Sequence, residues 1–144
     1  MLSPDGRLLA FAACLGLYAC DLHVLPLSAD LRPEGPPRQL TKERTHIGGM
    51  TWAPDARSLI YAAEPEGSPW LWRVPASGAA PPERIELAGP QASSPTASRA
   101  VNQLAFSRIA NSDPDIWKLD IGGRPEPLIA STRVDSNPQF SPAT

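Results

Sequence analysis

The side chains best suited to chemistry in this chain are two thiols and two imidazoles: Cys14, Cys20, His23 and His46. Thiolates and imidazoles are the usual ligands of zinc, and four of them would fill a tetrahedral site. The cysteines do not form a Cys-x-x-Cys pair, however, and the histidines lie far apart in the sequence. The sequence therefore predicts neither a metal nor another cofactor. Two cysteines are also too few for a disulfide framework, and we expect both to be unpaired thiols on or beside buried strands.

Carboxylates invite an acid–base mechanism, since Asp5, Asp55 and Asp115 each lie near a turn. Asp5 and Asp55 occupy the same position of a repeated turn, so we expect both to make Asx-type hydrogen bonds to their own backbone. Asp115 belongs to an Asp-Pro-Asp loop that is expected to cap or solvate a strand. The sequence has no nucleophile elbow, zinc-protease motif, P-loop or dinucleotide fingerprint. It therefore predicts no catalytic residues within this segment.

Composition favours a folded domain built from short elements. The 144 residues are 42% apolar and 19% charged, with a net charge of −2. That charge gives little attraction for nucleic acid, and no nucleic acid is expected to bind this segment. The 18 prolines and 10 glycines are scattered between apolar runs, which leaves little room for long helices.

The apolar run at 8–20, LLAFAACLGLYAC, imitates a secretory signal. A signal would carry only positive charge before this run, whereas Asp5 and a Pro-Asp-Gly turn precede it. The run is also too short to span a bilayer. Its register recurs later in the chain, so we interpret its first part, LLAFAA, as a strand and expect no membrane span here.

A repeat organises the whole sequence. Residues 3–11, 53–61 and 98–106 each begin with a small residue and reach an aromatic residue eight positions later, with leucine or isoleucine nearby. A fourth copy begins at Ser141, so the starts are separated by 50, 45 and 43 residues. Two further motifs recur with nearly the same spacing as the first. One lies at 22–25, 71–74 and 116–119, and the other at 38–41, 84–87 and 126–129. Four short segments in about 45 residues are typical of a β-propeller blade.

The predicted fold class is therefore all-β, a partial β-propeller made of four-stranded antiparallel blades. The innermost strands are expected near 47–53, 93–97 and 136–141. The other strands are expected near 7–13, 20–26, 37–41, 58–63, 70–75, 83–88, 102–108, 115–120 and 125–130.

The predicted blades divide the chain at 1–45, which lacks its first strand, 46–90, 91–134 and 135–144, the first strand of a fourth. Closed single-chain propellers have four to eight blades, whereas three blades would leave two exposed edges and an open wedge. We therefore expect the chain to be a fragment of a longer reading frame or one part of an assembly. The remaining blades would come from the same polypeptide or another copy.

At these motifs the chain resembles the TolB-like propeller repeats, relatives of the WD-type repeats. The resembling pieces are LSPDGRLLAF at 2–11, DLHVLPL at 21–27, RQLT at 38–41, WAPDARSLIYAA at 52–63, LWRVPASG at 71–78 and DIWKLDIGGRPEPLIASTRVDSNPQFSP at 115–142. The last piece is most similar to the propellers that follow winged-helix domains in bacterial regulators. The chain departs from the pattern at Ala56, where the turn glycine is expected, and at 99–101, where Pro-Asp-Gly is missing. The third turn must therefore be built differently.

The resemblance implies a non-catalytic binding or sensing module that recognises a protein or peptide, because TolB itself is a periplasmic partner-binding protein. It also implies a periplasmic or otherwise extracytoplasmic location, with a cytoplasmic one still open. The alternative is an enzyme, since peptidases similar to prolyl oligopeptidase carry such propellers beside a hydrolase domain. In that case the catalytic residues would lie outside this chain.

Function concentrates in loops on a rigid scaffold, so the loops at 38–44 and 133–137 are the first places to look. Within or beside them Arg44, His46, Arg133 and Asp135 are predicted to surround the entrance of a central channel. There His46 is either a ligand-binding group or a plain loop histidine. His23 stands where later repeats have tryptophan, and we interpret it as a packing residue with one satisfied nitrogen.

Overall fold

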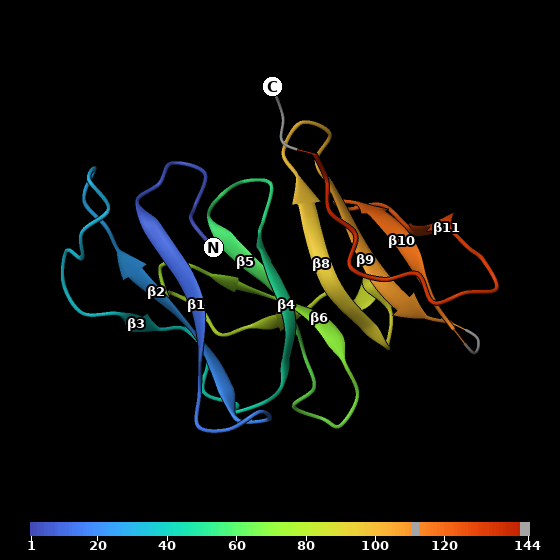
Figure 1. Ribbon diagram of the computed structural model, residues 1–144, viewed down its shortest axis with the longest axis horizontal. Helices are drawn as coiled ribbons and strands as arrows, with labels where there is room; N and C mark the ends of the chain where they lie inside the picture. The colour runs from blue at the N-terminus through green and yellow to red at the C-terminus, as the bar shows by residue number, and fades with distance from the viewer. Residues whose placement is uncertain (111–112, 142–144) are drawn as a thin grey trace.

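The computed structural model describes residues 1–110 and 113–141. These residues form eleven strands and one short 3-10 helix, arranged as three antiparallel sheets (Figure 1). No helix within the described ranges is long and apolar enough to cross a membrane.

Each sheet is a simple meander whose strands follow one another along the chain. The first contains β1 (Leu8–Cys14), β2 (Cys20–Pro26) and β3 (Arg38–Gln39). The second contains β4 (Ile47–Trp52), β5 (Ser58–Ala63), β6 (Trp70–Pro75) and β7 (Glu83–Arg84). The 3-10 helix η1 (Glu86–Ala88) leads to the third, with β8 (Ala92–Ser98), β9 (Gln103–Ile109), β10 (Pro114–Asp120) and β11 (Pro125–Ile129). The sheets stand side by side like blades, which confirms the all-β, partial-propeller prediction (Figure 1).

Most predicted strands agree with the observed ones to within two residues, and three differ. Where outer strands were predicted at 37–41 and 83–88, the structure has only the two-residue strands β3 and β7. The strand predicted at 136–141 is wrong, because these residues form no ladder with any described strand. This segment has no neighbouring strand to pair with among the described residues, whereas the equivalent left-handed residue and proline, Ser94 and Pro95, lie within β8, which pairs with β9. Residues 142–144, where the fourth copy of the turn was expected, lie outside the described residues.

The cores lie between the sheets, and β5 contributes to both. Successive side chains of a strand point to opposite faces, so Leu59 and Tyr61 pack against the first sheet while Ile60 and Ala62 pack against the third. All six residues of β5 are buried. A strand covered on both faces explains why the second copy reads as a continuous apolar run.

The turns before β1 and β5 confirm the structural role predicted for their aspartates. Asp5 Oδ1 accepts a hydrogen bond from the Arg7 N–H at 3.1 Å, and Asp55 Oδ1 accepts one from the Arg57 N–H at 2.9 Å. The Ser3 hydroxyl also donates to Asp5 at 2.7 Å, and this bond lowers the pKa of the carboxyl below its usual value. These contacts hold the aspartates as turn residues.

The fourth residue of that turn needs a left-handed backbone. Gly6 adopts it with φ 72°, and Ala56 adopts it at the equivalent position with φ 62°. In the third copy the left-handed residue is Asn102, with φ 53°, one position later than the alignment places it. The third turn is therefore built differently, as predicted.

Candidate functional site

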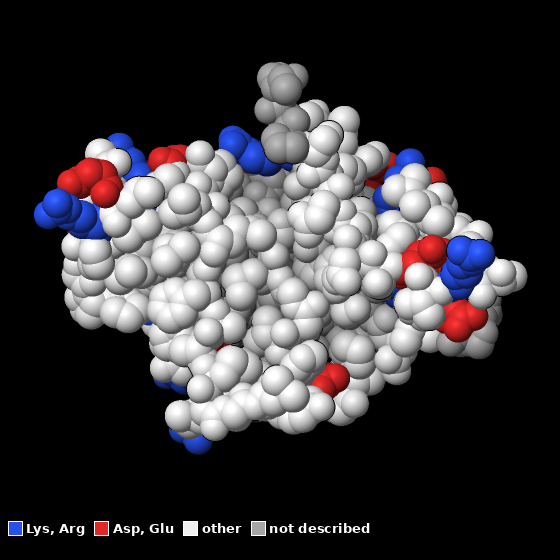
Figure 2. Space-filling model, in the orientation of Figure 1, with Lys and Arg blue, Asp and Glu red and all other residues white. Residues whose placement is uncertain are grey.

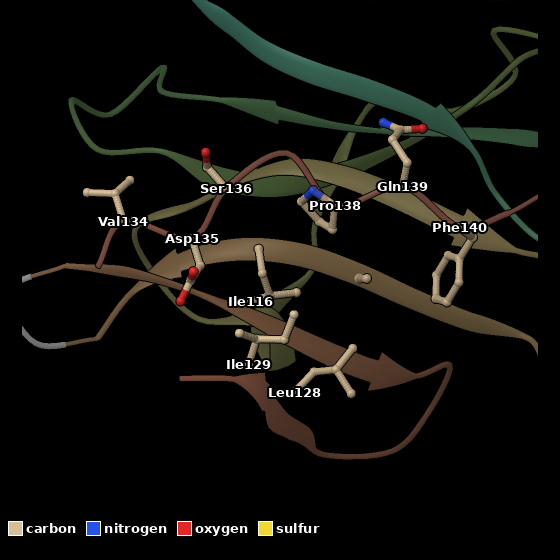
Figure 3. A pocket seen from close by; sticks show the side chains of 10 residues that line it. Ile116, Leu128, Ile129, Val134, Asp135, Ser136, Pro138, Gln139 and Phe140 are labelled. Carbon is tan, nitrogen blue, oxygen red and sulfur yellow. The ribbon is translucent and has the colours of Figure 1, made fainter. Parts of the chain in front are cut away.

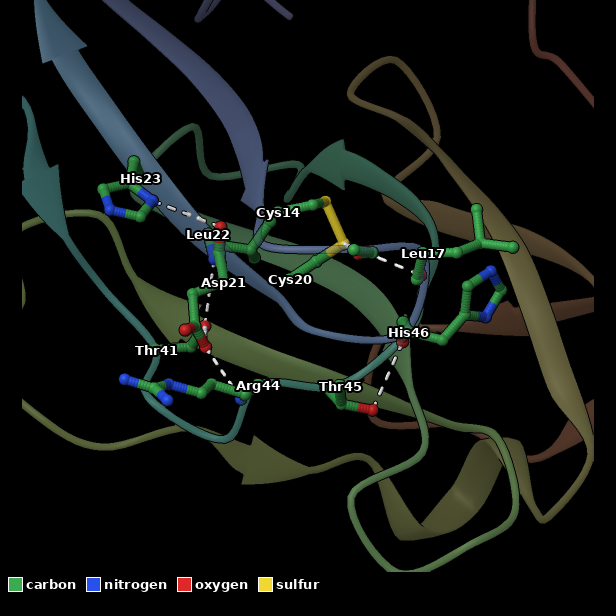
Figure 4. The surroundings of a disulfide bond; sticks show 11 residues. Cys14, Leu17, Cys20, Asp21, Leu22, His23, Thr41, Arg44, Thr45 and His46 are labelled. Atoms are coloured by element: carbon green, nitrogen blue, oxygen red, sulfur yellow. Dashed lines mark hydrogen bonds between the residues drawn. A yellow bond between two sulfur atoms is a disulfide. The ribbon is translucent and has the colours of Figure 1, made fainter.

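A disulfide marks one end of the first blade, where the β1–β2 loop meets the segment leading to β4. Cys14 and Cys20 are bonded to each other, so the prediction of unpaired thiols was wrong (Figure 4). The hairpin register places them directly opposite each other, Cys14 on the last residue of β1 and Cys20 on the first of β2. Cys20 also exchanges two backbone hydrogen bonds with Thr45, of 2.9 and 3.2 Å. The disulfide thus closes the hairpin loop, and the backbone bonds of Cys20 with Thr45 tie the base of this loop to the segment that leads to the second blade.

The loop that the disulfide closes presents apolar side chains to solvent. Leu15, Leu17 and Tyr18 are 83%, 72% and 67% exposed. The crosslink at the base of the loop restricts its conformations, so a partner would meet side chains that are already partly ordered. The Tyr18 ring lies 5.5 Å from the His46 ring, centroid to centroid. We call Leu15, Leu17, Tyr18 and His46 the apolar loop site.

Sequence reasoning placed strands at 7–13 and 20–26 and did not consider the connection between them, which carries the three loop residues, as a candidate site. A signal was available: the run is longer than one strand, so part of it had to be a connection. Gly16 within the run marks where that connection lies.

Asp21 fixes the segment that carries Arg44. Its buried Oδ1 accepts hydrogen bonds from the Thr41 hydroxyl and the Arg44 N–H, both at 3.1 Å. The Thr41 hydroxyl oxygen in turn accepts from the Leu22 N–H at 3.0 Å. Arg44 adopts a left-handed backbone with φ 50°, and its side chain extends away from His46 (Figure 4). The two predicted rim residues therefore share one loop but point in different directions.

His46 lies in a small groove between the second and third sheets. Its Nδ1 is 3.9 Å from Glu64 Oε1, and its side chain is partly exposed. The groove has a volume of about 130 Å³, and small residues such as Gly48, Ala62 and Ser93 line it. The imidazole and the carboxylate can each form hydrogen bonds here, which suits recognition of a polar group.

The other two predicted rim residues lie on the third blade, in the segment after β11. The Asp135 N–H donates to the Pro114 carbonyl at 2.9 Å, and Asp135 Oδ2 accepts from the Ser131 hydroxyl at 2.8 Å. Arg133 is exposed, and its N–H donates to the same hydroxyl at 3.0 Å. Within residues 1–110 and 113–141, no hydrogen bond or salt bridge joins this pair to Arg44 or His46. The four predicted residues thus form two separate groups.

Asp135 also lines a pocket on the third blade. The pocket has a volume of about 490 Å³ and lies between the sheet and the segment that crosses it (Figure 3). Its apolar walls are Ala105, Ile116, Leu128, Ile129, Val134, Pro138 and Phe140.

The inner strands give the centre of the molecule a neutral surface. Neither β4, IGGMTW, nor β8, ASSPTAS, contains a charged residue. In Figure 2 the middle of the visible face is nearly free of charge, and the charged side chains gather toward its periphery. Such a surface offers backbone groups and small side chains rather than a phosphate-binding patch.

The fold is that of a TolB-like β-propeller. The crystal structure of TolB from Acinetobacter baumannii is similar with a TM-score of 0.71 and 21% identity, over 94% of this chain and 33% of that chain. A putative TolB from Agrobacterium tumefaciens is similar with a TM-score of 0.70 and 22% identity, over 89% of this chain and 47% of that chain. This chain therefore spans between one third and about half of these TolB chains. The finer resemblance to winged-helix regulators has no support from these structures.

No protein-family model matches the sequence, and no curated protein matches it either. The likeness rests on structure at low identity, so it establishes the architecture alone.

Proposed function

We propose that this chain is a non-catalytic β-propeller binding module, and that it recognises a protein or peptide through the apolar loop site. The observation that carries the proposal is the disulfide-closed loop with Leu15, Leu17 and Tyr18 exposed. Clustered exposed apolar side chains on a rigid support are typical of recognition surfaces. Tyrosine is also among the residues enriched at protein interfaces.

Polar groups beside the loop can fix the orientation in which a peptide binds to the apolar loop site. His46 and Glu64 offer a donor and an acceptor within one groove, and Arg44 adds an exposed cation on the same loop. An apolar centre with a polar rim is the usual anatomy of a protein-binding surface. The neutral inner strands and the net charge of −2 favour a peptide over nucleic acid.

The peptidase alternative would place its catalytic residues outside this chain, and no observation favours it; the chain's own two histidines serve other contacts. The His23 ring stacks on Phe11, and its Nδ1 contacts the Asp21 carbonyl at 3.2 Å. His46 faces Glu64 and Tyr18. Neither ring has a hydroxyl or thiol partner among the described hydrogen bonds, so neither is placed to activate a nucleophile. His23 fits the packing role predicted for it.

We infer an extracytoplasmic location, such as the periplasm, in preference to the cytoplasmic one. The support is the Cys14–Cys20 disulfide, because such bonds persist in oxidising compartments and are rare in the cytosol.

We also infer that the segment from Asp135 begins a fourth blade. Its N–H donates to the Pro114 carbonyl, and the Ala92 N–H donates to the Pro69 carbonyl at 3.2 Å at the equivalent point between the second and third blades. The chain thus leaves the third blade by the route it takes out of the second.

Selection from a random dodecapeptide phage library on the disulfide-bonded protein tests the binding proposal. The affinities of selected peptides would be measured by fluorescence polarisation on the wild type and on Leu17→Asp/Tyr18→Ser. We expect the double variant to bind at least about tenfold more weakly, since it removes the apolar centre. Leu31→Asp is the matched control, because Leu31 is an exposed leucine in another loop. Equal losses in both variants, or no selected peptide that depends on Leu17 and Tyr18, would refute the proposal.

A further inference from the structure

We propose that the groove beside His46 binds the ammonium group of a lysine side chain, with Glu64 as its counter-ion. This inference deepens the proposed function, and the assignment of the lysine to a peptide at the apolar loop site rests on that function. The groove lies between the second and third sheets, and its lining residues all fall between His46 and Ser93. Both of its walls are therefore present in the described chain.

The carboxylate of Glu64 is the acceptor that a cation would meet in this groove. Its side chain is only 29% exposed, and its salt-bridge partner among the described residues is His46 Nδ1 at 3.9 Å. That distance is too long for a hydrogen bond, and no hydrogen bond between described residues reaches the carboxylate. In the same loop, Glu66 accepts a hydrogen bond from Arg84 at 3.2 Å. A partly covered carboxylate that accepts no hydrogen bond is stabilised when a charged donor reaches it.

The charged groups at the groove favour a cation over an anion. Neither lysine nor arginine is among the lining residues, and the titratable ones are Glu64 and His46. The Arg44 side chain extends away from His46 and brings no positive charge to the groove (Figure 4). An anionic ligand would therefore meet a carboxylate with no permanent cation beside it, whereas an ammonium group would be attracted.

The shape of the groove fits an unbranched alkyl chain. Its volume of about 130 Å³ is the liquid volume of roughly four water molecules. Ala62, Ala63 and Pro69 give it apolar walls. A Cβ atom at Gly48 would lie 3.5 Å from the Ala62 Cβ and 3.7 Å from the Ser93 Cβ, so glycine keeps this space open. The stem of a lysine can lie along these walls while its ammonium group reaches Glu64.

The polar groups at the groove match an ammonium group better than a guanidinium. Besides Glu64, the lining has the Ser93 hydroxyl and the His46 imidazole, and a neutral imidazole has one nitrogen that accepts. An ammonium group carries three donors on one rotatable centre, so it can meet acceptors that come from different strands and loops. A guanidinium requires a partner in the plane of its fork. We therefore infer lysine rather than arginine.

The groove adjoins the apolar loop site through His46. The His46 ring lies 5.5 Å from the Tyr18 ring, centroid to centroid, and its Nδ1 faces Glu64. A peptide whose apolar side chains contact Leu17 and Tyr18 can thus place a neighbouring lysine in the groove. The ligand class that follows is a peptide with a lysine close to apolar residues.

Amide chemical shifts of the isotope-labelled chain, titrated with N-acetyl-lysine-methylamide at about pH 8, test the groove by itself. The matched probe is N-acetyl-norleucine-methylamide, which lacks only the ammonium group. We expect the lysine probe to shift the Gly48 and Ser93 amides saturably, with a dissociation constant in the millimolar range. The norleucine probe should bind at least about threefold more weakly.

Glu64→Gln is expected to weaken the lysine probe at least about threefold, because it removes the charge and keeps the shape. Glu66→Gln is the matched control, since it removes the same charge from the same loop but Glu66 does not line the groove. Gly48→Ala is a second variant of the groove itself, and its methyl group would occupy the open space at ordinary contact distances. It should weaken both probes.

The lysine assignment is overturned if the lysine probe gives no saturable shift or if the two probes bind equally. It is also overturned if Glu64→Gln binds the lysine probe as the wild type does, or if Glu66→Gln causes an equal loss. Each variant must keep the dispersed spectrum of the wild type. If Glu64→Gln does not, undiminished binding of the lysine probe by Gly48→Ala has the same meaning.

Peptides selected on the protein separate this inference from the proposed function. If peptides that depend on Leu17 and Tyr18 tolerate replacement of every lysine by norleucine, the lysine inference fails and the proposed function stands. If the lysine probe binds as expected and no selected peptide depends on Leu17 and Tyr18, the proposed function fails and the assignment of the groove stands without it.

Discussion

The hydroxyl of Ser94 donates a hydrogen bond of 3.0 Å to the side-chain oxygen of Asn137, 43 residues further along the chain. Both residues have left-handed backbones, with φ 50° and 55°, and both occupy the repeat position held by Gly49 in the second blade. β4 and β8 each have a register shift at this position, between Ile47 and Met50 and between Ser93 and Thr96. The inner strands therefore bulge at the same place and approach one another there.

Gly49→Ala is expected to destabilise the protein by about 2 kcal/mol or more. A methyl group at Gly49 would lie 3.0 Å from the Ser94 Cα, and φ 118° is unfavourable for any side chain. Gly48→Ala is the matched control, because its nearest neighbour would be the Ala62 Cβ at 3.5 Å and its φ is not positive. Urea unfolding of both variants measures the difference, and equal effects would contradict a close approach of the strands at Gly49.

The strands could be predicted because buried strand positions require apolar residues, and this requirement is visible in the local sequence. β5 lies between two sheets and reads as a continuous apolar run, and the first two turns repeat an aspartate. The bulges were not predictable, since Gly49, Ser94 and Asn137 share no residue type and a bulge depends on the partner strand. The prediction of a strand at 136–141 was wrong for a related reason. A strand forms only beside a partner strand, and the sequence pattern of a segment does not show whether a partner is present.

Ala56→Gly is expected to stabilise the protein by about 0.5 to 1 kcal/mol. Ala56 holds φ 62°, a conformation that costs alanine free energy and that glycine adopts freely. The reverse substitution, Gly6→Ala, imposes the same strain at the equivalent turn and should destabilise by a similar amount. Thermal unfolding followed by circular dichroism compares the two, and a lower melting temperature for Ala56→Gly would contradict this account.

Asp21→Ala is expected to cost about 2 to 3 kcal/mol, because it leaves the Arg44 N–H without its acceptor and removes the bond from Thr41. Asp21→Asn keeps an acceptor oxygen in the same place and should cost less. Chemical denaturation gives both free energies. Hydrogen exchange at the Arg44 amide adds a local readout, and protection that persists in Asp21→Ala would contradict the role assigned to Asp21.

The sequence pointed to the loop at 38–44 and to His46 beside it, but not to the apolar side chains of the loop at 15–18. Arg44 and His46 lie in the loop expected to carry function, since a loop before an inner strand must reach the end of the blade. Their directions depend on the hydrogen bond from the Arg44 N–H to Asp21 and on φ 50°, neither of which leaves a sequence signature. The disulfide depends on hairpin register, and a shift of one residue would have separated Cys14 from Cys20.

Loss of the disulfide, by reduction or by Cys14→Ser/Cys20→Ser, is expected to destabilise the protein by roughly 2 kcal/mol through the greater freedom of a short loop in the unfolded chain. It should also raise hydrogen exchange at 15–19, while β5 in the core should be less affected. Mass-resolved exchange with and without reductant checks both expectations. Unchanged exchange in the loop would show that the crosslink does not order it.

The contribution of Asp5 to stability is expected to disappear in acid. Its pKa lies below the usual value of an aspartate, chiefly because the Ser3 hydroxyl and then the Arg7 N–H donate to the carboxylate. A lowered folded-state pKa stabilises the protein above the unfolded-state value, and this stability is lost as pH falls through the folded-state pKa. Wild type should therefore exceed Asp5→Asn in melting temperature at about pH 6, and the gap should close toward about pH 2. In a Ser3→Ala background the gap at about pH 6 should be smaller, and a gap that is independent of both pH and Ser3 would contradict this origin.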